Sequence, residues 1–382
     1  MRETDFTRPA GKIVNTLGGY RTFVPDSLTP KLDLTAALGT LTECASALGE
    51  LQGTAKRTEN PYILIEPLQR REALTTSAME GTFTTMEELL LEEESATSKP
   101  DANARETANF ILALRESIRG ISDYSVSLRV IKGAHARLLS GLPDERGANK
   151  RPGEFKNMQN WIGGGRDISN ARYVPPSPAD TQTAMSELEI YINRPLPDFS
   201  QRIIDLALVH YQFEAIHPFA DGNGRIGRML VTLISINSKL LDLPILFLSP
   251  YLEKHKDEYI DLMYGVSARS EWIPWLNFFF NCITQTCKDT ISKIERLLNL
   301  QREYRQRVAK AGRSAKLVET VDMLFRTPFV SIPRLAEHFH ITYRAAQLIV
   351  VKLVVVGILV ERTTSFPKYF VAQEIIAAVN RD

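Results

Sequence analysis

Residues 202–228 read RIIDLALVHYQFEAIHPFADGNGRIGR, in which an apolar segment runs without a turn residue as far as Pro218. Strands of buried sheets usually end after about four to eight residues, so an apolar run of this length predicts a buried helix. The glycine-rich stretch that follows predicts a sharp turn, and a second helix is predicted to begin near Arg225. The segment therefore indicates two helices joined by a tight turn within a mainly α-helical fold.

A dinucleotide-binding fold is the first alternative, because Gly222, Gly224 and Gly227 fit the pattern GxGxxG. Asp242 also lies where a ribose-binding acid would be expected. That fingerprint requires a strand immediately before the glycines, whereas the preceding segment indicates a helix. The chain also lacks the GxxxxGK[ST] motif of a P-loop and the loops of protein kinases. We therefore interpret the glycine spacing as a coincidence.

The turn combines groups that suit a polyphosphate. Successive backbone N–H groups that open a helix bind anions. Gly222 and Gly224 place no Cβ beside Asn223, so the backbone can approach a phosphate closely. Arg225 and Arg228 are three residues apart and share one helix face, and two guanidinium groups suit a polyphosphate better than a single carboxylate.

Two further side chains in the turn carry chemistry. Asp221 offers a hard oxygen ligand that suits Mg²⁺ between two phosphates. His217 can accept a proton near neutral pH from an attacking hydroxyl. Taken singly, His-Pro indicates a helix cap, Asp-Gly a turn and a helical arginine a solvated side chain. The conjunction at this spacing is far more specific than any of them.

The stretch HPFADGNGRIGR matches the signature of the Fic family, HxFx(D/E)GNGRxxR, at every defined position. The sequence resembles Fic proteins from about residue 30 to 300. Upstream, TTSAMEGT resembles their inhibitory motif (S/T)xxxE(G/N), with Thr76, Glu80 and Gly81 in place. Residues 151–178 resemble the family flap, a β-hairpin. The resemblance implies a Fic-type helical bundle with this flap, of the class whose inhibitory helix is N-terminal and whose C-terminus is a winged helix-turn-helix.

The resemblance also implies an enzyme, a nucleotidyltransferase that moves AMP from ATP to a Ser, Thr or Tyr hydroxyl of a target protein and releases pyrophosphate. His217 would deprotonate that hydroxyl, and Asp221 would hold Mg²⁺ against the phosphates. Such transfer depends mainly on positioning and charge neutralisation. The other positions implied to bind the nucleotide are Gly222, Asn223, Gly224 and Arg225 at the α- and β-phosphates and Arg228 at the γ-phosphate.

Glu80 would inhibit by competition, since a carboxylate paired with Arg228 takes the guanidinium that the γ-phosphate needs. Without the motif downstream, Glu80 would be better interpreted as a surface residue at a helix end. Other Fic proteins transfer phosphate, UMP or phosphocholine, but a glutamate directed at a γ-phosphate makes sense only with a nucleoside triphosphate. Removal of AMP by the same residues, with Glu80 orienting a water, stays open as the reverse activity.

The flap, at about 153–174, is expected to hold an extended segment of the target protein by strand addition. The same site allows self-modification. In the aromatic-rich stretch 251–264 we assign Tyr259 to the adenine wall, although a packed helix face is the expected role of most of these side chains.

The chain is expected to divide into an N-terminal arm and inhibitory region (1–100), a catalytic core with the flap (101–290), a linker helix (291–313) and a winged helix-turn-helix (314–382). Residues 1–30 are expected to be irregular and to lie on the main body. Helices are predicted near 31–52, 62–80, 84–94, 103–120, 127–140, 178–193, 199–216, 224–241, 251–265 and 271–300.

Residues 314–382 predict three short helices followed by two strands around a turn. They carry eight Lys or Arg against six Asp or Glu. The candidate recognition helix offers Arg344 and Gln347 but is otherwise mostly Val, Leu and Ile. Because a DNA-reading helix needs an exposed polar face, protein contact or homodimerisation is favoured over DNA binding. A transcription regulator that senses a nucleotide is the alternative from another functional class.

Composition limits the number of domains and the class of protein that we expect. A chain of 382 residues fits two or three domains, and 44% hydrophobic with 24% charged residues is typical of a globular protein. The net charge of +1 argues for neither a nucleic-acid nor a membrane partner. Cys44, Cys282 and Cys287 form no CxxC pair, which favours a reducing compartment. The chain starts without a secretory signal, and its longest apolar stretch, 348–360, is too short to span a bilayer, so we expect a cytoplasmic protein.

Overall fold

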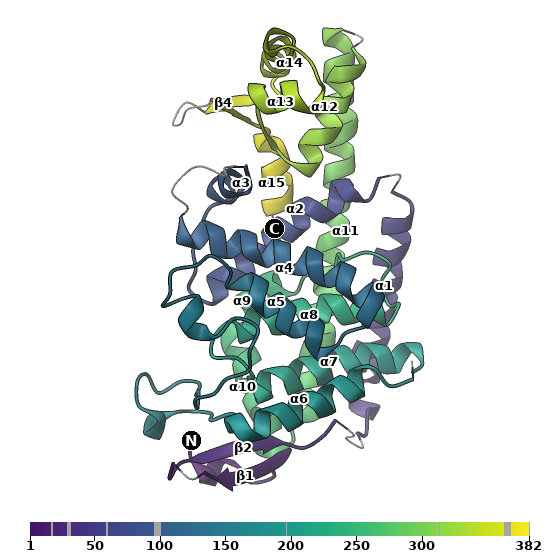
Figure 1. Ribbon diagram of the computed structural model, residues 1–382. Coiled ribbons are helices and arrows are strands. Elements are labelled where there is room, and N and C mark those ends of the chain that lie inside the picture. Colours follow the sequence, from purple (N-terminus) through teal and green to yellow (C-terminus); the bar gives the residue numbers. More distant parts are fainter. Residues whose placement is uncertain are drawn as a thin grey trace.

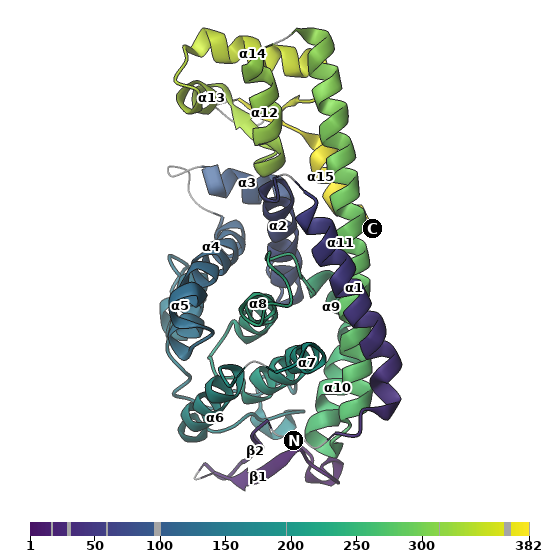
Figure 2. The same ribbon diagram turned by 90° about the vertical axis from the view of Figure 1, so that its right-hand side faces the viewer.

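The computed structural model describes residues 1–16, 18–28, 32–58, 60–94, 101–195, 197–312, 314–362 and 368–381. The architecture is mainly helical and elongated (Figure 1). One helix, α11 (Trp272–Ala311), extends along most of its length and connects the main body to a C-terminal module (Figure 2). A β-hairpin close to the N-terminus covers the opposite end.

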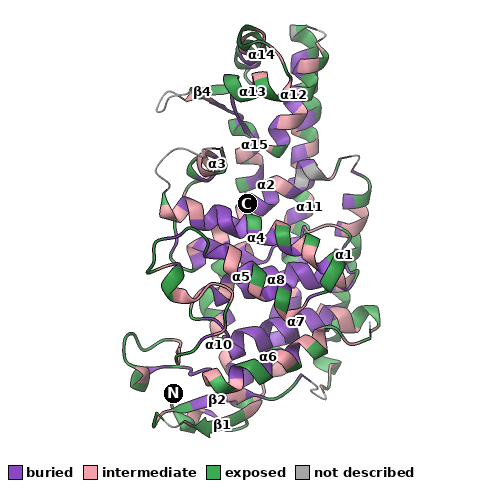
Figure 3. Ribbon diagram, viewed as in Figure 1, coloured by how far each residue is buried: buried purple, intermediate pink, exposed green. Residues whose placement is uncertain are grey.

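The buried centre is the helix pair predicted from the sequence, α7 (Phe199–Ile216) and α8 (Asn223–Asn237). Every residue of α7 from Ile203 to Ile216 is buried, which explains the unbroken apolar run (Figure 3). The Asp198 side chain accepts a hydrogen bond from the Gln201 N–H and so caps the first turn of this helix. The surrounding helices are α4 (Ala102–Tyr124), α5 (Leu128–Leu138), α6 (Pro178–Ile192), α9 (Ser249–Lys254) and α10 (Lys256–Arg269).

The N-terminal helices differ in where they pack. Helix α1 (Leu38–Lys56) packs along α11 beside the main body, whereas α2 (Tyr62–Met79) and α3 (Met86–Glu94) lie between the helical centre and the C-terminal module (Figure 2). The predicted inhibitory motif, Thr76 to Gly81, covers the end of α2 and the turn after it. Short 3₁₀ turns occur at Glu3–Asp5, Thr35–Ala37, Ala148–Lys150 and Ile168–Asn170.

The first thirty residues are more regular than predicted. Strands β1 (Gly11–Asn15) and β2 (Arg21–Pro25) form an antiparallel hairpin, and the prediction of an irregular arm is wrong for this part. The arm does lie on the main body, as expected, because the Phe23 N–H donates to the Val174 carbonyl and the Phe23 ring packs on Tyr173. The start of the helix predicted at residue 31 lies outside the described residues, and α1 begins at Leu38.

Two other elements differ from prediction. The flap is a hairpin-shaped loop with a single antiparallel bridge, Ile162 to Tyr173, rather than two regular strands. Three consecutive glycines, Gly163 to Gly165, have positive φ angles, and the prolines that follow Val174 donate no ladder hydrogen bonds. The helix predicted at 251–265 is divided at His255 into α9 and α10.

The C-terminal module combines helices with a three-stranded antiparallel sheet in the order β3–β5–β4. Its element order agrees with three helices followed by a hairpin, while the predicted turn of that hairpin lies within 363–367, outside the described residues. Residues 291–311 of the expected linker form the end of the continuous α11, and residue 313 lies outside the described residues. The elements are α12 (Ala315–Arg326), β3 (Phe329–Ser331), α13 (Ile332–His338), α14 (Tyr343–Val355), β4 (Val360–Arg362), β5 (Tyr369–Val371) and α15 (Gln373–Asn380).

The module contacts the helices on either side of the predicted inhibitory motif, α2 and α3. Leu90 of α3 forms a small apolar cluster with Phe329 and Val371 of the sheet. The buried Arg70 of α2 donates to the Arg326 carbonyl of α12 (2.6 Å) and to Glu93 of α3 (2.7 Å). Within the described residues, none of the helices has the length and apolar character that crossing a membrane requires.

Candidate active site

The turn between α7 and α8 depends on two left-handed residues. His217 ends α7 with φ 48°, and its N–H donates to the Phe213 carbonyl at 2.9 Å. Gly222 begins α8 with φ 76°, a conformation that glycine adopts without a Cβ clash. These two residues let the chain reverse within a few positions, so that the His217 side chain and the first turn of α8 face the same space.

The side chain of Asn223 closes the turn from inside. Its Oδ1 accepts from the Phe219 N–H (2.8 Å), and its Nδ2 donates to the Phe219 carbonyl (2.9 Å). The buried Phe219 ring stacks on His135, with ring centres 3.8 Å apart. Asn223 therefore shapes the turn with its side chain, and the contact that remains for a phosphate is its backbone N–H in the first turn of α8.

His135 is a second support of the turn. Its Nδ1 accepts from the Gly153 N–H at 2.9 Å, so the proton lies on Nε2, which donates to the Asp221 carbonyl at 3.1 Å. Burial lowers the pKa of His135 to about 4, which keeps this ring neutral at physiological pH. The contact fixes the backbone at Asp221 while leaving its carboxylate at the surface.

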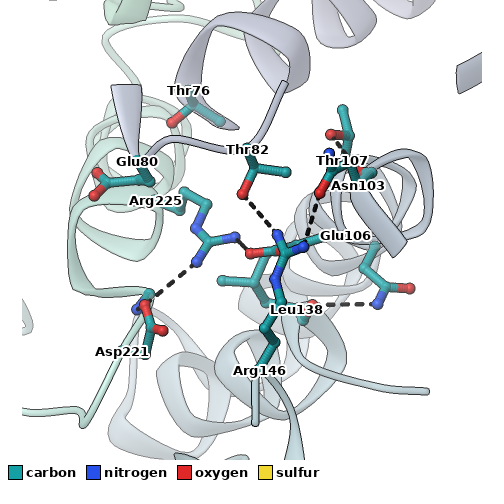
Figure 4. Close-up of polar contacts among 12 residues, drawn as sticks. Thr76, Glu80, Thr82, Asn103, Glu106, Thr107, Leu138, Arg146, Asp221 and Arg225 are labelled. Atoms are coloured by element: carbon teal, nitrogen blue, oxygen red, sulfur yellow. Dashed lines mark hydrogen bonds and ion pairs between the residues drawn. The ribbon is translucent and has the colours of Figure 1, made fainter. Parts of the chain in front are cut away.

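Arg225 is held in a buried ion-pair network (Figure 4). Its guanidinium pairs with Glu106 of α4 and lies 3.5 Å from the Asp221 carboxylate. Glu106 also pairs with Arg146, which donates to the Thr82 hydroxyl at 2.9 Å. The network ties the start of α8 to α4 and to the residue that follows the inhibitory motif.

Arg228 binds Thr76 and Glu80 at the end of α2. Its Nη2 donates to Glu80 Oε1 at 2.7 Å, its Nε donates to the Thr76 hydroxyl at 2.7 Å, and Nη2 also reaches the Thr76 carbonyl at 3.1 Å. Gly81, with φ 83°, ends α2 directly after Glu80. The motif therefore binds the Nε and Nη2 donors of Arg228 from one turn at the end of a single helix.

The Glu80 carboxylate lies against the first turn of α8. A Cβ placed on Gly224 would collide with Glu80 Oε1, so the absence of a side chain at this position admits the carboxylate. Burial pushes the pKa of Glu80 upward, but the Arg228 guanidinium outweighs burial and holds the pKa below its ordinary value. An ionised carboxylate thus occupies the anion-binding end of the helix.

The imidazole of His217 is neutral in this setting. Burial, followed by the nearby Lys156 charge, lowers its pKa to about 4. Its Nδ1 is buried without a hydrogen-bond partner among the described residues and lies 3.8 Å from Glu214 Oε2. Burial raises the pKa of Glu214 to about 8, so this carboxyl carries a proton at neutral pH. A neutral imidazole with a free lone pair can accept a proton.

A cavity of about 400 Å³ opens beside these groups. Its polar end contains Glu80, His217 and Arg228, and its walls come from α7, α10 and the flap. Tyr259 lies in the wall, where its hydroxyl donates to His210 at 2.8 Å. The cavity therefore joins an anion-binding end to a largely aromatic and aliphatic wall, as a nucleotide site requires.

Comparison with known proteins identifies this arrangement. The Fic/DOC family model matches residues 125–235, and the Fic/DOC family N-terminal model matches residues 38–119, so that together they span about half of the chain. The chain belongs to the Fic/DOC family. The first match contains the turn and His217, and the second contains the inhibitory motif with Glu80.

Curated Fic relatives share part of the sequence. The chain is 27% identical over 161 residues to the protein adenylyltransferase Fic of Aedes aegypti, which covers 42% of this chain and 28% of that protein. It is 31% identical over 114 residues to the Drosophila grimshawi protein of the same name, covering 30% and 21%. The matched regions thus span less than a third of these relatives.

Solved structures of Fic proteins share the fold. A Fic family protein from Desulfovibrio desulfuricans superposes with a TM-score of 0.55 at 18% identity, covering 90% of this chain and 97% of that one. Fic-1 from C. elegans gives a TM-score of 0.50 at 18% identity, covering 70% and 74%. The Fic fold therefore extends over most of the chain.

The cavity brings together five of the predicted site residues, which are Glu80, His217, Gly224, Arg228 and Tyr259. Asp221, Gly222, Asn223 and Arg225 lie in or beside the turn but do not line the cavity. The roles of all these residues toward a nucleotide stay predictions. Three residues of the site were not anticipated from the sequence: Glu214, Glu106 and His135. Glu214 precedes His217 by three positions, which places both on one helix face. Glu106 and His135 lie on α4 and α5, and no local motif marks them.

Asp221 is the candidate ligand for Mg²⁺. One carboxylate oxygen accepts from the Gly222 N–H at 2.6 Å, and the other has no hydrogen bond within the described part of the chain. Its side chain is 43% exposed. No cluster of three metal-ligating side chains occurs among the described residues. A single exposed carboxylate fits Mg²⁺, which binds proteins through one or two carboxylates and completes its shell with phosphates and water.

Proposed function

We propose that the protein is a self-inhibited protein adenylyltransferase, which transfers AMP from ATP to a hydroxyl of a target protein and releases pyrophosphate. The observation that carries the proposal is the Glu80 carboxylate bound to Arg228 against Gly224, at the end of a cavity that contains His217. A carboxylate of the chain thus occupies an anion site beside a neutral base. The names of the curated relatives support the same activity.

The chemical step assigned to His217 is removal of the proton from the target hydroxyl. The oxygen attacks the α-phosphorus, the bond from that phosphorus to the β-phosphate oxygen breaks, and the proton stays on the imidazole. The lowered pKa of His217 supports this role, because the imidazole is available unprotonated at neutral pH. Its fixed backbone supports it too, since a base must lie within hydrogen-bond reach of the proton.

The α8 end of the site would bind the phosphates. The backbone N–H groups of Asn223 and Gly224 would receive the α- and β-phosphates, and Arg228 would receive the γ-phosphate once Glu80 leaves. Arg225 would add charge from behind the turn. A Mg²⁺ ion held by Asp221 would supply charge neutralisation across the phosphates.

Inhibition follows from occupancy of Arg228. While Glu80 holds this guanidinium, a triphosphate meets a carboxylate at the position of its terminal phosphate, and both groups are negative. A nucleotide displaced in this way would present its α-phosphate poorly to the hydroxyl, and misplacement by roughly 1 Å can cost about 10²-fold in rate. Release requires Glu80 to leave Arg228, which is a change at the end of α2.

The flap would hold the target. Residues about 153–174 reach the cavity through Trp161, Ile162 and Tyr173. Because only one bridge closes the flap, much of its backbone is free to pair with an extended segment of a target. Such pairing is largely blind to sequence, and it also allows self-modification.

We infer that the C-terminal module is a winged helix-turn-helix, and that it contacts protein rather than DNA. Its second long helix, α14, exposes apolar side chains, with Leu348 and Val351 each 50% exposed and Val355 80% exposed. A DNA-reading helix would present polar groups there. Sedimentation velocity and a mobility-shift assay at a fixed salt concentration test this. Self-association or a protein complex agrees with the assignment, whereas salt-sensitive DNA binding contradicts it.

Labelled ATP tests the proposed activity. Wild type, Glu80→Gly and Glu80→Gly/His217→Ala proteins are incubated with α- or γ-labelled ATP and Mg²⁺. The proposal predicts transfer of α-label by Glu80→Gly, weak transfer by wild type, and loss of transfer when His217 is replaced. Transfer of γ-label, or retained α-label without His217, would contradict it. Release of AMP from a pre-modified target would instead indicate the reverse activity.

A further inference from the structure

Four consecutive carbonyl groups of the catalytic turn, at residues 216–219, are bound by the beginning of the flap. The Lys156 backbone N–H donates to the Pro218 carbonyl at 2.8 Å. Its ammonium group donates to the carbonyls of Ile216 (3.2 Å) and His217 (3.0 Å). The Asn160 amide donates to those of His217 (3.1 Å) and Phe219 (3.0 Å). Two flap residues therefore satisfy all four of these carbonyls.

Lys156 is an unusual residue to find in this position. It is 4% exposed, and no carboxylate of the described chain forms an ion pair with it. Its third polar contact is the Asn160 side-chain oxygen at 2.8 Å. Burial lowers the pKa of the ammonium group to about 7. A buried amine without a counter-ion is costly, and here it is compensated only by carbonyl oxygens that belong to the turn or to its partner Asn160.

The backbone that these contacts hold is itself unfavourable. His217 has a left-handed conformation with φ 48°, which non-glycine residues rarely adopt because Cβ then lies too close to the backbone. Such a conformation persists when the surrounding structure determines it. The backbone angle of His217 sets the direction of its imidazole, so contacts that fix its carbonyl also fix the base.

We propose that Lys156, together with Asn160, is a positioning residue that holds the imidazole of His217 in register with the flap. The flap then presents the target hydroxyl to a base whose distance from the flap backbone is fixed by these hydrogen bonds. The proposal rests on the proposed function, since it assigns His217 as the base and the flap as the target site. At the other end of the flap, the Tyr173 hydroxyl donates to the Ala215 carbonyl at 2.8 Å, so both ends are attached to α7.

The geometry separates this role from nucleotide binding. Neither Lys156 nor Asn160 lines the cavity that would receive ATP. A change at Lys156 should therefore lower the rate at saturating ATP and leave the KM for ATP unchanged. A general loss of folded protein would lower the amount of active enzyme, which titration of active protein and thermal unfolding would both reveal.

The test uses α-label transfer in the Glu80→Gly protein, in which the proposed brake is absent. Lys156→Met removes the ammonium group, Lys156→Arg keeps a cationic donor, and Asn160→Ala removes the second contact. Lys293→Met is the matched control, because Lys293 is another fully buried lysine and lies on α11, away from the site. All variants are compared with the Glu80→Gly parent by kcat, the KM for ATP and thermal unfolding.

We expect Lys156→Met and Asn160→Ala to lower kcat by about tenfold or more, since a displaced base of this kind costs one to two orders of magnitude. The KM for ATP should stay within about twofold, Lys156→Arg should recover part of the lost rate, and Lys293→Met should match the parent. If Lys156→Met does not fold, the comparison of Asn160→Ala with the Glu80→Gly parent tests the proposal.

A kcat within twofold of the parent for the variant that folds would overturn the proposal. So would a rise in the KM for ATP that accounts for the loss, or Lys156→Arg that is no better than Lys156→Met. These outcomes differ from failure of the proposed function, because in that case the Glu80→Gly parent itself transfers no α-label.

Discussion

Arg228 binds a carboxylate of its own chain where the proposed reaction needs a phosphate. Thr76 and Glu80 bind its Nε and Nη2 donors from one turn at the end of α2, and Gly224 gives the carboxylate room. Under the proposed function, Glu80 and the γ-phosphate would compete for this guanidinium. A single residue would then decide whether the site accepts a nucleotide in a productive position.

Replacing Glu80 tests this exchange. Glu80→Gly should raise α-label transfer by about one to two orders of magnitude, because Arg228 becomes available to the phosphate. Glu80→Gln keeps the size of the side chain but loses its charge, so its rate should fall between those of wild type and Glu80→Gly. Rates are measured at saturating Mg²⁺ and ATP. Equal rates for all three proteins would show that Glu80 is no brake.

Glu214 should make the free energy of unfolding depend on pH, in a direction that its raised pKa determines. Its pKa is about 8 in the folded protein and about 4.5 for a free glutamate. The folded state therefore holds the proton more tightly, and its contribution to stability is complete below pH 4.5 and lost as pH rises through 8. Glu214→Gln cannot lose this proton. The free energy of unfolding of Glu214→Gln, minus that of wild type, should therefore increase from pH 5 to 8, by at most about 1.4 kcal/mol per pH unit.

Urea unfolding at pH 5, 6.5 and 8 measures this difference for the two proteins. Other buried carboxyls, such as Glu72, titrate in both proteins and cancel in the comparison. A difference between wild type and Glu214→Gln that is constant over this range would mean that Glu214 titrates normally in the folded protein.

Local spacing was sufficient to nominate the candidate residues of the motifs. His217, Asp221 and Arg228 lie in one short motif, and Glu80 lies in another, so their types and distances along the chain marked them as candidates. Lys156, Asn160 and Glu106 act through contacts between distant segments. The Lys156 ammonium group, for example, meets carbonyls about sixty residues away. No periodicity or motif in the sequence records such a contact.

Among the elements, the N-terminal hairpin is the one that the sequence predicted least well. Phe23 of β2 is fully buried and packs on Phe6 and Tyr173, which connects the hairpin to the exit of the flap. The helices were predicted well because their apolar periodicity is long. The hairpin and the flap are short, contain several glycines and gain their order from packing on the body, which local sequence cannot show.

Phe23→Ala should therefore destabilise the whole protein by about 3–5 kcal/mol, the usual cost of removing a buried phenylalanine. The matched control is Phe83→Ala, since Phe83 is 68% exposed and the same substitution there should change stability by less than about 0.5 kcal/mol. Urea unfolding measures both. A Phe23→Ala protein as stable as the control would show that the hairpin is a loosely attached arm.

At the scale of the whole molecule, α2 links the C-terminal module to the active site. Arg70 connects its middle to α12 and α3, and Glu80 lies at its end in the site. The Lys256 ammonium group of α10 donates to the Met79 carbonyl at 2.7 Å and holds the same end. Glu80, the proposed inhibitory residue, thus lies at the end of a helix that is held both by the module and by the core.

Loosening the module contact should weaken the brake. Arg70→Met removes the hydrogen bonds to the Arg326 carbonyl and Glu93, so we expect α-label transfer above wild type but below Glu80→Gly. In the Glu80→Gly protein the same change should add nothing, because no brake remains. Arg305→Met is the control, because it removes an ion pair between α11 and Asp322 of α12 that does not involve α2. Equal additional activation in both backgrounds would contradict the coupling.

The most direct test of the account is the intact mass of the Glu80→Gly protein after incubation with ATP and Mg²⁺. The account predicts a covalent adduct of one or more AMP groups, which is absent when His217 is also replaced by alanine. An adduct with the mass of a phosphate, or an AMP adduct that persists without His217, would contradict the assignment of His217 as the base for adenylyl transfer.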